Sequence, residues 1–152
     1  MIEGLLLLSV AFLGSLAMVL SGSGQDNGGR KLPDYLEVLR KAEHLDDSAI
    51  GYAAKRSETF QAFEQGLSAG NSVLADLDWL VKHASPAGRI YAAILINQID
   101  KEAGRKVLES LKTDKDIVNY RTGSLVEDRS VGELAADLLR GETIIIFRPP
   151  TR

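Results

Sequence analysis

The chain contains no cysteine, so disulfide bonds, thiolate metal sites and a cysteine nucleophile are all excluded. It has only two histidines, His44 and His83, and no His-Glu-x-x-His pattern joins them. We expect each histidine near the end of a helix, where an imidazole can meet terminal carbonyl groups. Two distant histidines without a thiol do not predict a zinc site. The sequence therefore predicts no metal ion and no cofactor.

Several common catalytic patterns are absent as well. The sequence has no Ser-x-x-Lys, no Gly-x-Gly-x-x-Gly and no EF-hand loop. Paired acids can serve acid–base catalysis if the fold brings them together across a cleft. Adjacent acids are more often solvated turns or helix caps. We therefore assign no catalytic residue to the pairs Asp46/Asp47, Asp76/Asp78, Asp114/Asp116 and Glu127/Asp128.

An excess of charge of one sign is missing too. The whole chain has 18 basic and 21 acidic residues. Residues 1–29 contain Glu3 and Asp26 but no Lys or Arg, so the rest of the chain has 18 basic and 19 acidic residues. A nearly neutral domain has no electrostatic footprint for nucleic acid or for an anionic bilayer. We expect no nucleic-acid partner.

The N-terminal segment is the strongest signal in the chain. Residues 4–25 carry no charge, and residues 5–20 are dense in Leu, Val, Ala and Phe. About 20 apolar residues span a bilayer as a helix, whereas a signal peptide has a shorter apolar region behind a positively charged start. Because no Lys or Arg precedes the run, we predict an uncleaved transmembrane anchor or signal segment at 1–22, with residues 4–21 in the membrane. A cleaved signal peptide and a helix buried in the domain remain alternatives.

Residues 23–31 are rich in Gly, Ser, Asn and Gln, which is typical of a flexible linker. Residues 32–152 then form the predicted soluble domain. The only basic residues near the apolar run, Arg30 and Lys31, lie on its C-terminal side. The positive-inside rule places that side in the cytoplasm, but the bias is only two residues. The side of the membrane therefore stays open.

From Leu32 onward a helical period dominates the sequence. The first helix begins near Pro33, which suits a first helical position, and Asp46-Asp47 ends it. Capping residues mark the starts of the later helices. They are Ser57, Asn71 or Ser72, Ser85 with Pro86, Asp100, and Ser130 with Glu133.

The predicted helices at 71–84, 85–99 and 100–112 follow one another with very short connections. Short connections make consecutive helices antiparallel neighbours. The middle helix has no charge and no strongly polar side chain over residues 90–96. A helix with partners on more than one side becomes apolar nearly all round. We interpret it as a central core helix, and the wall of a ligand site is the alternative. The predicted fold class is mainly α, with this array loosely similar to HEAT-type repeats.

The pattern changes after residue 116. The stretch "DIVNYRTGSLVED" predicts a β-hairpin over residues 117–128. The stretch "TIIIF" at 143–147 is short and β-branched, which indicates a strand. We expect it to join the hairpin as a third strand, because three strands are stable where a hairpin is marginal. The alternative is that it pairs with a partner's sheet edge.

Four stretches carry a resemblance that covers residues 48–140. They are "AIGYAAKRSETFQAF", "SPAGRIYAAIL", "DKEAGRKVLESL" and "VNYRTGSLVEDRSVGELA". Together they resemble a family of small, uncharacterised bacterial proteins with an N-terminal export or anchor segment. The resemblance implies a bacterial membrane or envelope protein, and it slightly favours the extracytoplasmic side. It implies no activity and no functional residues.

Arg89 lies in the first turn of its predicted helix, where a cation opposes the helix dipole. This mismatch predicts an acidic partner. The partner is internal, such as Asp76 or Asp78 on the preceding helix, or it belongs to another molecule.

The leading interpretation is a membrane-anchored, non-catalytic helical interaction or accessory domain. Its partner is then a protein, and the chain is a possible subunit of a membrane complex. The alternative is an enzyme or ligand-binding domain whose site is assembled from dispersed residues. The candidate interaction residues are Arg89, Tyr91, Tyr120 and Glu127.

Overall fold

The computed structural model describes residues 30–50 and 55–145. The chain divides into two units, Met1–Arg30 and Lys31–Arg152, and the description below concerns the second. Among the described residues, no helix is both long enough and apolar enough to cross a membrane. The predicted membrane segment at 1–22, and the predicted linker up to residue 29, lie outside the described residues.

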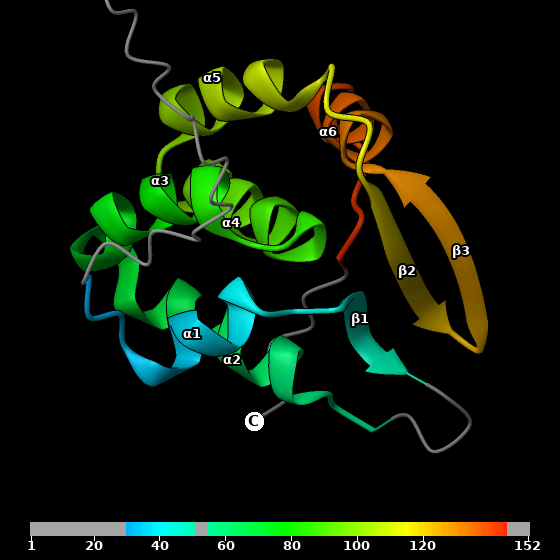
Figure 1. Ribbon diagram of the computed structural model, residues 1–152, viewed down its shortest axis with the longest axis horizontal. Coiled ribbons are helices and arrows are strands. Elements are labelled where there is room, and N and C mark those ends of the chain that lie inside the picture. Colours follow the sequence, from blue (N-terminus) through cyan, green and yellow to red (C-terminus); the bar gives the residue numbers. More distant parts are fainter. Residues whose placement is uncertain (1–29, 51–54, 146–152) are drawn as a thin grey trace, which may run out of the picture. The chain divides into compact units, whose positions relative to one another are not determined.

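The domain is mainly helical and carries a small three-stranded sheet, as the sequence predicts (Figure 1). The helices are α1 (Asp34–Arg40), α2 (Glu58–Ala69), α3 (Leu74–His83), α4 (Pro86–Ile99), α5 (Lys101–Leu111) and α6 (Val131–Leu139). A 3-10 turn, η1 (Gly70–Val73), joins α2 to α3. The strands are β1 (His44–Ile50), β2 (Ile117–Gly123) and β3 (Leu125–Ser130).

The predicted helix starts are confirmed at four places. Ser57, Ser85 and Asp100 each accept a hydrogen bond from a backbone N–H in the first turn of α2, α4 and α5. At α6, Ser130 and Glu133 form the predicted capping box. These side chains satisfy donors that the helix itself leaves unpaired.

The predicted cap at Asn71 or Ser72 is wrong. The chain turns at Gly70, whose φ of 58° lies in the left-handed region, and then makes the 3-10 turn before α3. The Ser72 hydroxyl donates backward to the carbonyl of Ala69 instead of capping α3. Because the backbone stays helical into α3, no residue there has the extended conformation that an N-cap requires.

Helix α4 is the core helix, as predicted. Every residue from Ile90 to Ile96 is buried. The helix contacts each of the other α-helices and the strands β1 and β2 (Figure 1). Neighbours on all sides explain why its sequence has no polar face.

The predicted hairpin is confirmed, and β2 and β3 pair antiparallel from Ile117↔Ser130 to Thr122↔Leu125. Gly123, at φ 57°, provides the turn. The third strand is β1, which pairs parallel with β2, with His44 opposite Asn119 and Asp46 opposite Arg121. The prediction that His44 ends a helix is therefore wrong, and so is the prediction that Asp46-Asp47 breaks one. By contrast, His83 does lie at the end of α3, with Nδ1 2.8 Å from the carbonyl oxygen of Trp79.

The predicted strand at 143–147 does not form over its described part. Ile144 and Ile145 are buried, but their backbone bends and belongs to no strand. The hydroxyl of Tyr120 donates to the carbonyl of Ile144 at 2.6 Å. The tail is thus packed inside the domain, as expected, while the third strand of the sheet is β1, which pairs with β2. Residues 146 and 147 lie outside the described residues.

Candidate functional site

A buried aspartate stands at the edge of the helical core. Asp46 is only 1% exposed, although the sequence places it in a solvated acidic pair. Its Oδ1 accepts a hydrogen bond from Nε of Arg121 at 2.6 Å, and its Oδ2 accepts one from Oγ1 of Thr59 at 2.7 Å. The neighbouring Asp47 is buried too. The expectation of a solvated turn is therefore wrong, because β1 turns Asp46 toward partners from β2 and α2.

The pKa of Asp46 lies below its usual range. Burial alone raises the pKa of a carboxyl group. Here hydrogen bonds from Arg121, Thr59 and Ser57, together with the charge of Arg121, outweigh burial and lower it. The carboxylate is therefore ionised at neutral pH and remains paired with Arg121.

Tyr91 joins this cluster to the core helix. Its hydroxyl accepts a hydrogen bond from the backbone N–H of Asp46 at 2.7 Å. The ring packs against Phe63 of α2, with centroids 5.8 Å apart. Burial raises the pKa of Tyr91, so the phenol stays protonated. Helix α4 thus holds β1 in place directly behind Asp46.

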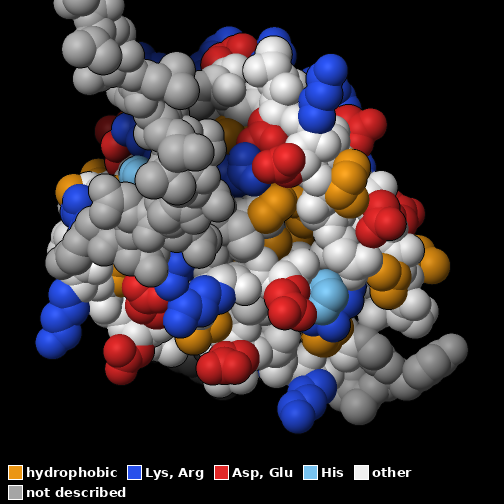
Figure 2. Space-filling model, viewed as in Figure 1, with side chains coloured by type: hydrophobic (Ala, Val, Ile, Leu, Met, Phe, Trp, Pro, Cys, Tyr) orange, Lys and Arg blue, Asp and Glu red, His pale blue; other side chains and the backbone are white. Residues whose placement is uncertain are grey.

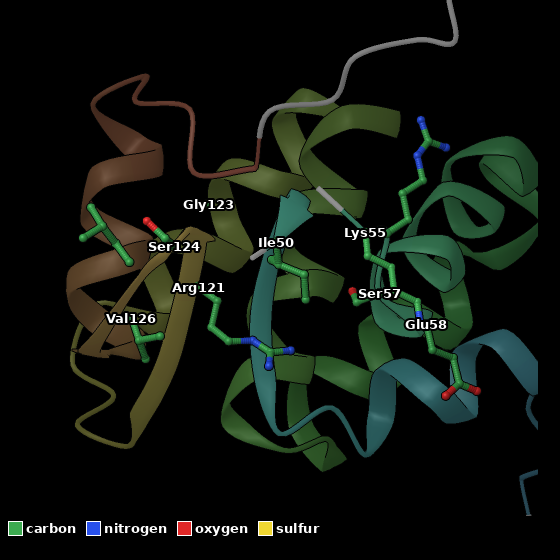
Figure 3. A pocket seen from close by; sticks show the side chains of 10 residues that line it. Ile50, Lys55, Ser57, Glu58, Arg121, Gly123, Ser124 and Val126 are labelled. Atoms are coloured by element: carbon green, nitrogen blue, oxygen red, sulfur yellow. The ribbon is translucent and has the colours of Figure 1, made fainter. Parts of the chain in front are cut away.

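Arg121 is held in a fixed position by these contacts. Its Nε is bonded to Asp46, its side chain is 30% exposed, and its two terminal amino groups have no hydrogen-bond partner among the described residues. Figure 3 shows the side chain extending from β2 across β1 toward Ser57. A guanidinium fixed through one nitrogen presents its remaining donors as a planar fork.

This fork borders a cleft of about 560 Å³ between the hairpin tip and the start of α2. One part of its lining is aliphatic, and the rest is mainly charged or polar (Figure 3). The aliphatic residues are Ile50, Leu125 and Val126. The charged residues are Lys55, Arg56, Glu58 and Arg121.

The charges of the cleft are unequally paired. Arg56 donates to both carboxylate oxygens of Glu64, at 2.9 Å each. Lys55 is exposed and has no ion pair among the described residues. Leu125 and Val126 are each 61% exposed, which is unusual for large aliphatic side chains in this domain. The cleft therefore combines accessible cationic groups with an uncovered aliphatic wall.

A second hollow of about 370 Å³ lies next to the first and shares Ser57, Glu58 and Arg121 with it. His44 lines this second hollow, and its Nδ1 is buried without a hydrogen-bond partner among the described residues. Arg121 thus separates two adjoining depressions, and both surround the Asp46 cluster.

The internal partner predicted for Arg89 exists, but it is not on the preceding helix. Arg89 is bonded to Asp114 and, at 2.5 Å, to Asp116. Both acids lie in the connection between α5 and β2, because the first turn of α4 packs against that connection. Asp78 pairs instead with Lys82 on its own helix. Asp114 and Asp116, expected in a solvated turn, therefore anchor this arginine.

The other predicted candidates occupy different surroundings. Tyr91 is buried behind Asp46, and Tyr120 is half-buried against the tail. Glu127 is exposed on β3 directly opposite Tyr120. The described contacts bring Tyr120 and Glu127 together but do not join Arg89 to them.

Sequence reasoning missed the cluster beside the cleft, which consists of Asp46, Thr59 and Arg121. Only the aliphatic Leu45 before the acidic pair hinted that β1 is a strand, since alternation of buried and polar residues is a strand signal. No local pattern connects Asp46 with an arginine 75 positions away.

Comparison with protein-family models, curated proteins and solved structures finds no match to this chain.

The distribution of charged side chains on the surface agrees with the near-neutral charge of the domain. On the face shown in Figure 2, basic and acidic side chains are interspersed, with small hydrophobic patches among them.

Proposed function

We propose that this chain is a membrane-anchored, non-catalytic binding domain that recognises a protein partner at the cleft beside Arg121. The supporting observation is the fixed guanidinium, which Asp46 holds through Nε while its terminal amino groups remain without partners among the described residues. Such an arginine is already ordered before binding, so little conformational entropy is lost when a partner binds. The exposed Leu125 and Val126 beside it are typical of an interaction surface.

The chemistry of the cluster supports binding over catalysis. Asp46 has a lowered pKa and both of its oxygens accept hydrogen bonds. Tyr91 has a raised pKa and is buried. A general acid or base needs a pKa near the working pH and access to the substrate, and neither residue has both. The alternative, an enzyme with a site built from dispersed residues, requires a titrating group elsewhere.

The membrane part of the proposal depends on the apolar run at 4–21, which has the length of a spanning helix. The helical part depends on α3, α4 and α5, which follow one another with very short connections. We propose that these helices form an antiparallel array similar to HEAT-type repeats, and that the domain acts as an accessory subunit of a membrane complex.

Two experiments test the proposal. First, full-length protein should stay with membranes through a carbonate wash, and its appearance intact in the supernatant would contradict the anchor. Second, affinity capture from solubilised membranes should recover a stoichiometric partner with the parent chain. Leu125→Ser/Val126→Ser should lose that partner.

The matched control for the capture is Ile117→Ser. Ile117 is 59% exposed on the same sheet but does not line the cleft. The Ile117→Ser chain should capture the partner as well as the parent does. Equal capture by all three chains would show that the cleft is not the binding surface.

A further inference from the structure

Arg121 and Val126 are cross-strand neighbours. They lie directly opposite each other in the β2–β3 ladder, so their side chains share one face of the sheet. Asp46 stands opposite Arg121 in β1 and belongs to the same row. The row therefore runs from an ion pair to an uncovered aliphatic side chain, with the arginine in the middle.

The arginine has more donors than the protein uses. A guanidinium carries five N–H groups, and only the one on Nε is committed to Asp46 among the described residues. The four on the terminal nitrogens have the spacing that a carboxylate accepts bidentately. Lys55 adds an exposed positive charge to the same cleft. The group that complements this arrangement is a carboxylate.

We propose that the cleft recognises a short peptide segment in which an acidic side chain neighbours an aliphatic one. The carboxylate binds the terminal amino groups of Arg121, and the aliphatic side chain packs on Val126, which shares its face of the sheet. This inference rests on the proposed function, because it names the feature of the partner that the cleft reads. The cleft volume of about 560 Å³ suits a few residues of a partner chain.

An anionic bilayer is the less favoured occupant of this surface. Membrane-surface recognition usually needs a cluster of about four to eight basic residues. Here Glu58 lines the cleft, and Glu127 and Asp128 follow Val126 along β3, all of them exposed. These acids repel an anionic surface, whereas a single carboxylate placed at Arg121 avoids them.

The test uses full-length protein in a neutral detergent and three capped tripeptides as probes. They are acetyl-Leu-Asp-Leu-amide, its neutral counterpart acetyl-Leu-Asn-Leu-amide, and acetyl-Gly-Asp-Gly-amide, which lacks aliphatic side chains. Binding is followed by NMR through the Nε–H signal of Arg121 and the methyl signals of Ile50, Leu125 and Val126. We expect the first probe to bind at least about 10-fold more tightly than either of the others, because only it satisfies both halves of the cleft.

Two variants test the carboxylate-binding half and the aliphatic half of the cleft separately. Arg121→Lys keeps a positive charge beside Asp46 but removes the fork, and it should erase the preference for Asp over Asn. Val126→Ser should erase the preference for Leu over Gly. Ile117→Ser, exposed but outside the cleft, should leave both preferences unchanged. The methyl spectrum of each variant without probe reports whether the domain is folded.

Equal binding of the Asp and Asn probes, or shifts confined to residues outside the cleft, would overturn the inference. Broadening of the Leu125 and Val126 methyl signals in nanodiscs with phosphatidylserine, but not in phosphatidylcholine alone, would identify a membrane surface instead. Partner capture that depends on Val126 without any Asp preference would leave the proposed function standing and refute only this ligand class. If the probes bind as expected but Leu125→Ser/Val126→Ser still captures the partner, the proposed function is refuted and the peptide preference of the cleft is not.

Discussion

Helix α4 and strand β1 lie against each other, yet different forces hold them. Residues Ile90 to Ile96 of α4 are buried among aliphatic and aromatic neighbours, and their contribution scales with the apolar area removed from water. In β1, by contrast, the buried Asp46 accepts hydrogen bonds from the charged Arg121 and from the hydroxyl group of Thr59. Apolar burial is non-directional, whereas each of these polar contacts requires one particular partner in one position.

The difference separates stability from specificity in this domain. A core helix can exchange aliphatic residues of similar volume and still fold. The Asp46 cluster tolerates no such exchange, because removing one member leaves another buried and unpaired. That requirement also fixes Arg121 beside the cleft. The two regions should therefore respond differently to mutation, to pH and to ligands.

The largest expected effect comes from the helix. Leu95→Ala should lower the free energy of unfolding by about 2–5 kcal/mol, since it opens a cavity at a fully buried site. Thermal or urea unfolding measures the change, and the loss should be the same at pH 4 and pH 7. Gln98→Ala, on the exposed side of the same helix, is the control and should stay within about 0.5 kcal/mol of the parent. A parent-like Leu95→Ala chain would show that α4 is not central to stability.

The second effect should depend on pH. Asp46→Asn should destabilise the domain by about 1.5–3 kcal/mol at pH 7, because hydrogen bonds to a charged group are lost in a buried place. The pKa of Asp46 is lowered in the folded protein, so its contribution is fully present above the unfolded pKa and is lost as pH falls through the folded one. The gap between parent and variant should therefore begin to narrow below about pH 4 and should close only below the lowered pKa of the folded protein.

The control for this prediction is Asp78→Asn. Asp78 is exposed, and its ion pair among the described residues is with Lys82, one turn along its helix, so the variant should stay within about 0.5 kcal/mol at both pH values. A gap for Asp46→Asn that persists unchanged at pH 3 would mean that lost shape, and not lost charge, explains the destabilisation.

The helical part of the fold could be predicted from the sequence because its signals are local. Ser57, Ser85, Asp100 and Ser130 each cap a helix with a backbone group only two or three residues away. The hairpin was predictable for the same reason, since Gly123 supplies the turn between its two strands. Such signals act over a few residues and need no knowledge of the rest of the chain.

The sheet edge and the cleft could not be predicted, because their causes lie far apart in the sequence. β1 is a strand through its parallel pairing with β2, which begins more than 70 residues later. Asp46 is buried only because Arg121 and Thr59 meet it there. The predicted strand at 143–147 was wrong over its described part for a related reason: the third strand is β1, which comes from a distant part of the chain.

The third effect combines features of both regions and should be smaller than either of the first two. Arg89 is 17% exposed, and it joins α4 to Asp114, which is 16% exposed, and to the more exposed Asp116. Exposed pairs contribute about 0–1 kcal/mol and broken buried pairs about 3–5 kcal/mol. We expect Arg89→Ala to destabilise by about 1–2 kcal/mol in urea unfolding. Asp116→Asn should cost less than Asp114→Asn, and the reverse order would contradict this use of burial.

The smallest effect on stability should come from the aliphatic wall of the cleft. This prediction separates residues that bind a partner from residues that stabilise the fold. Val126 is 61% exposed, so Val126→Ser removes little buried area and should change the unfolding free energy by no more than about 0.5 kcal/mol. Ile117→Ser, matched in exposure at the other end of the hairpin, should change it equally little. If Val126 instead supports the fold, its replacement should shift the melting temperature well beyond that of Ile117→Ser. Equal melting of both variants with unequal partner capture would separate the binding surface from the core that carries it.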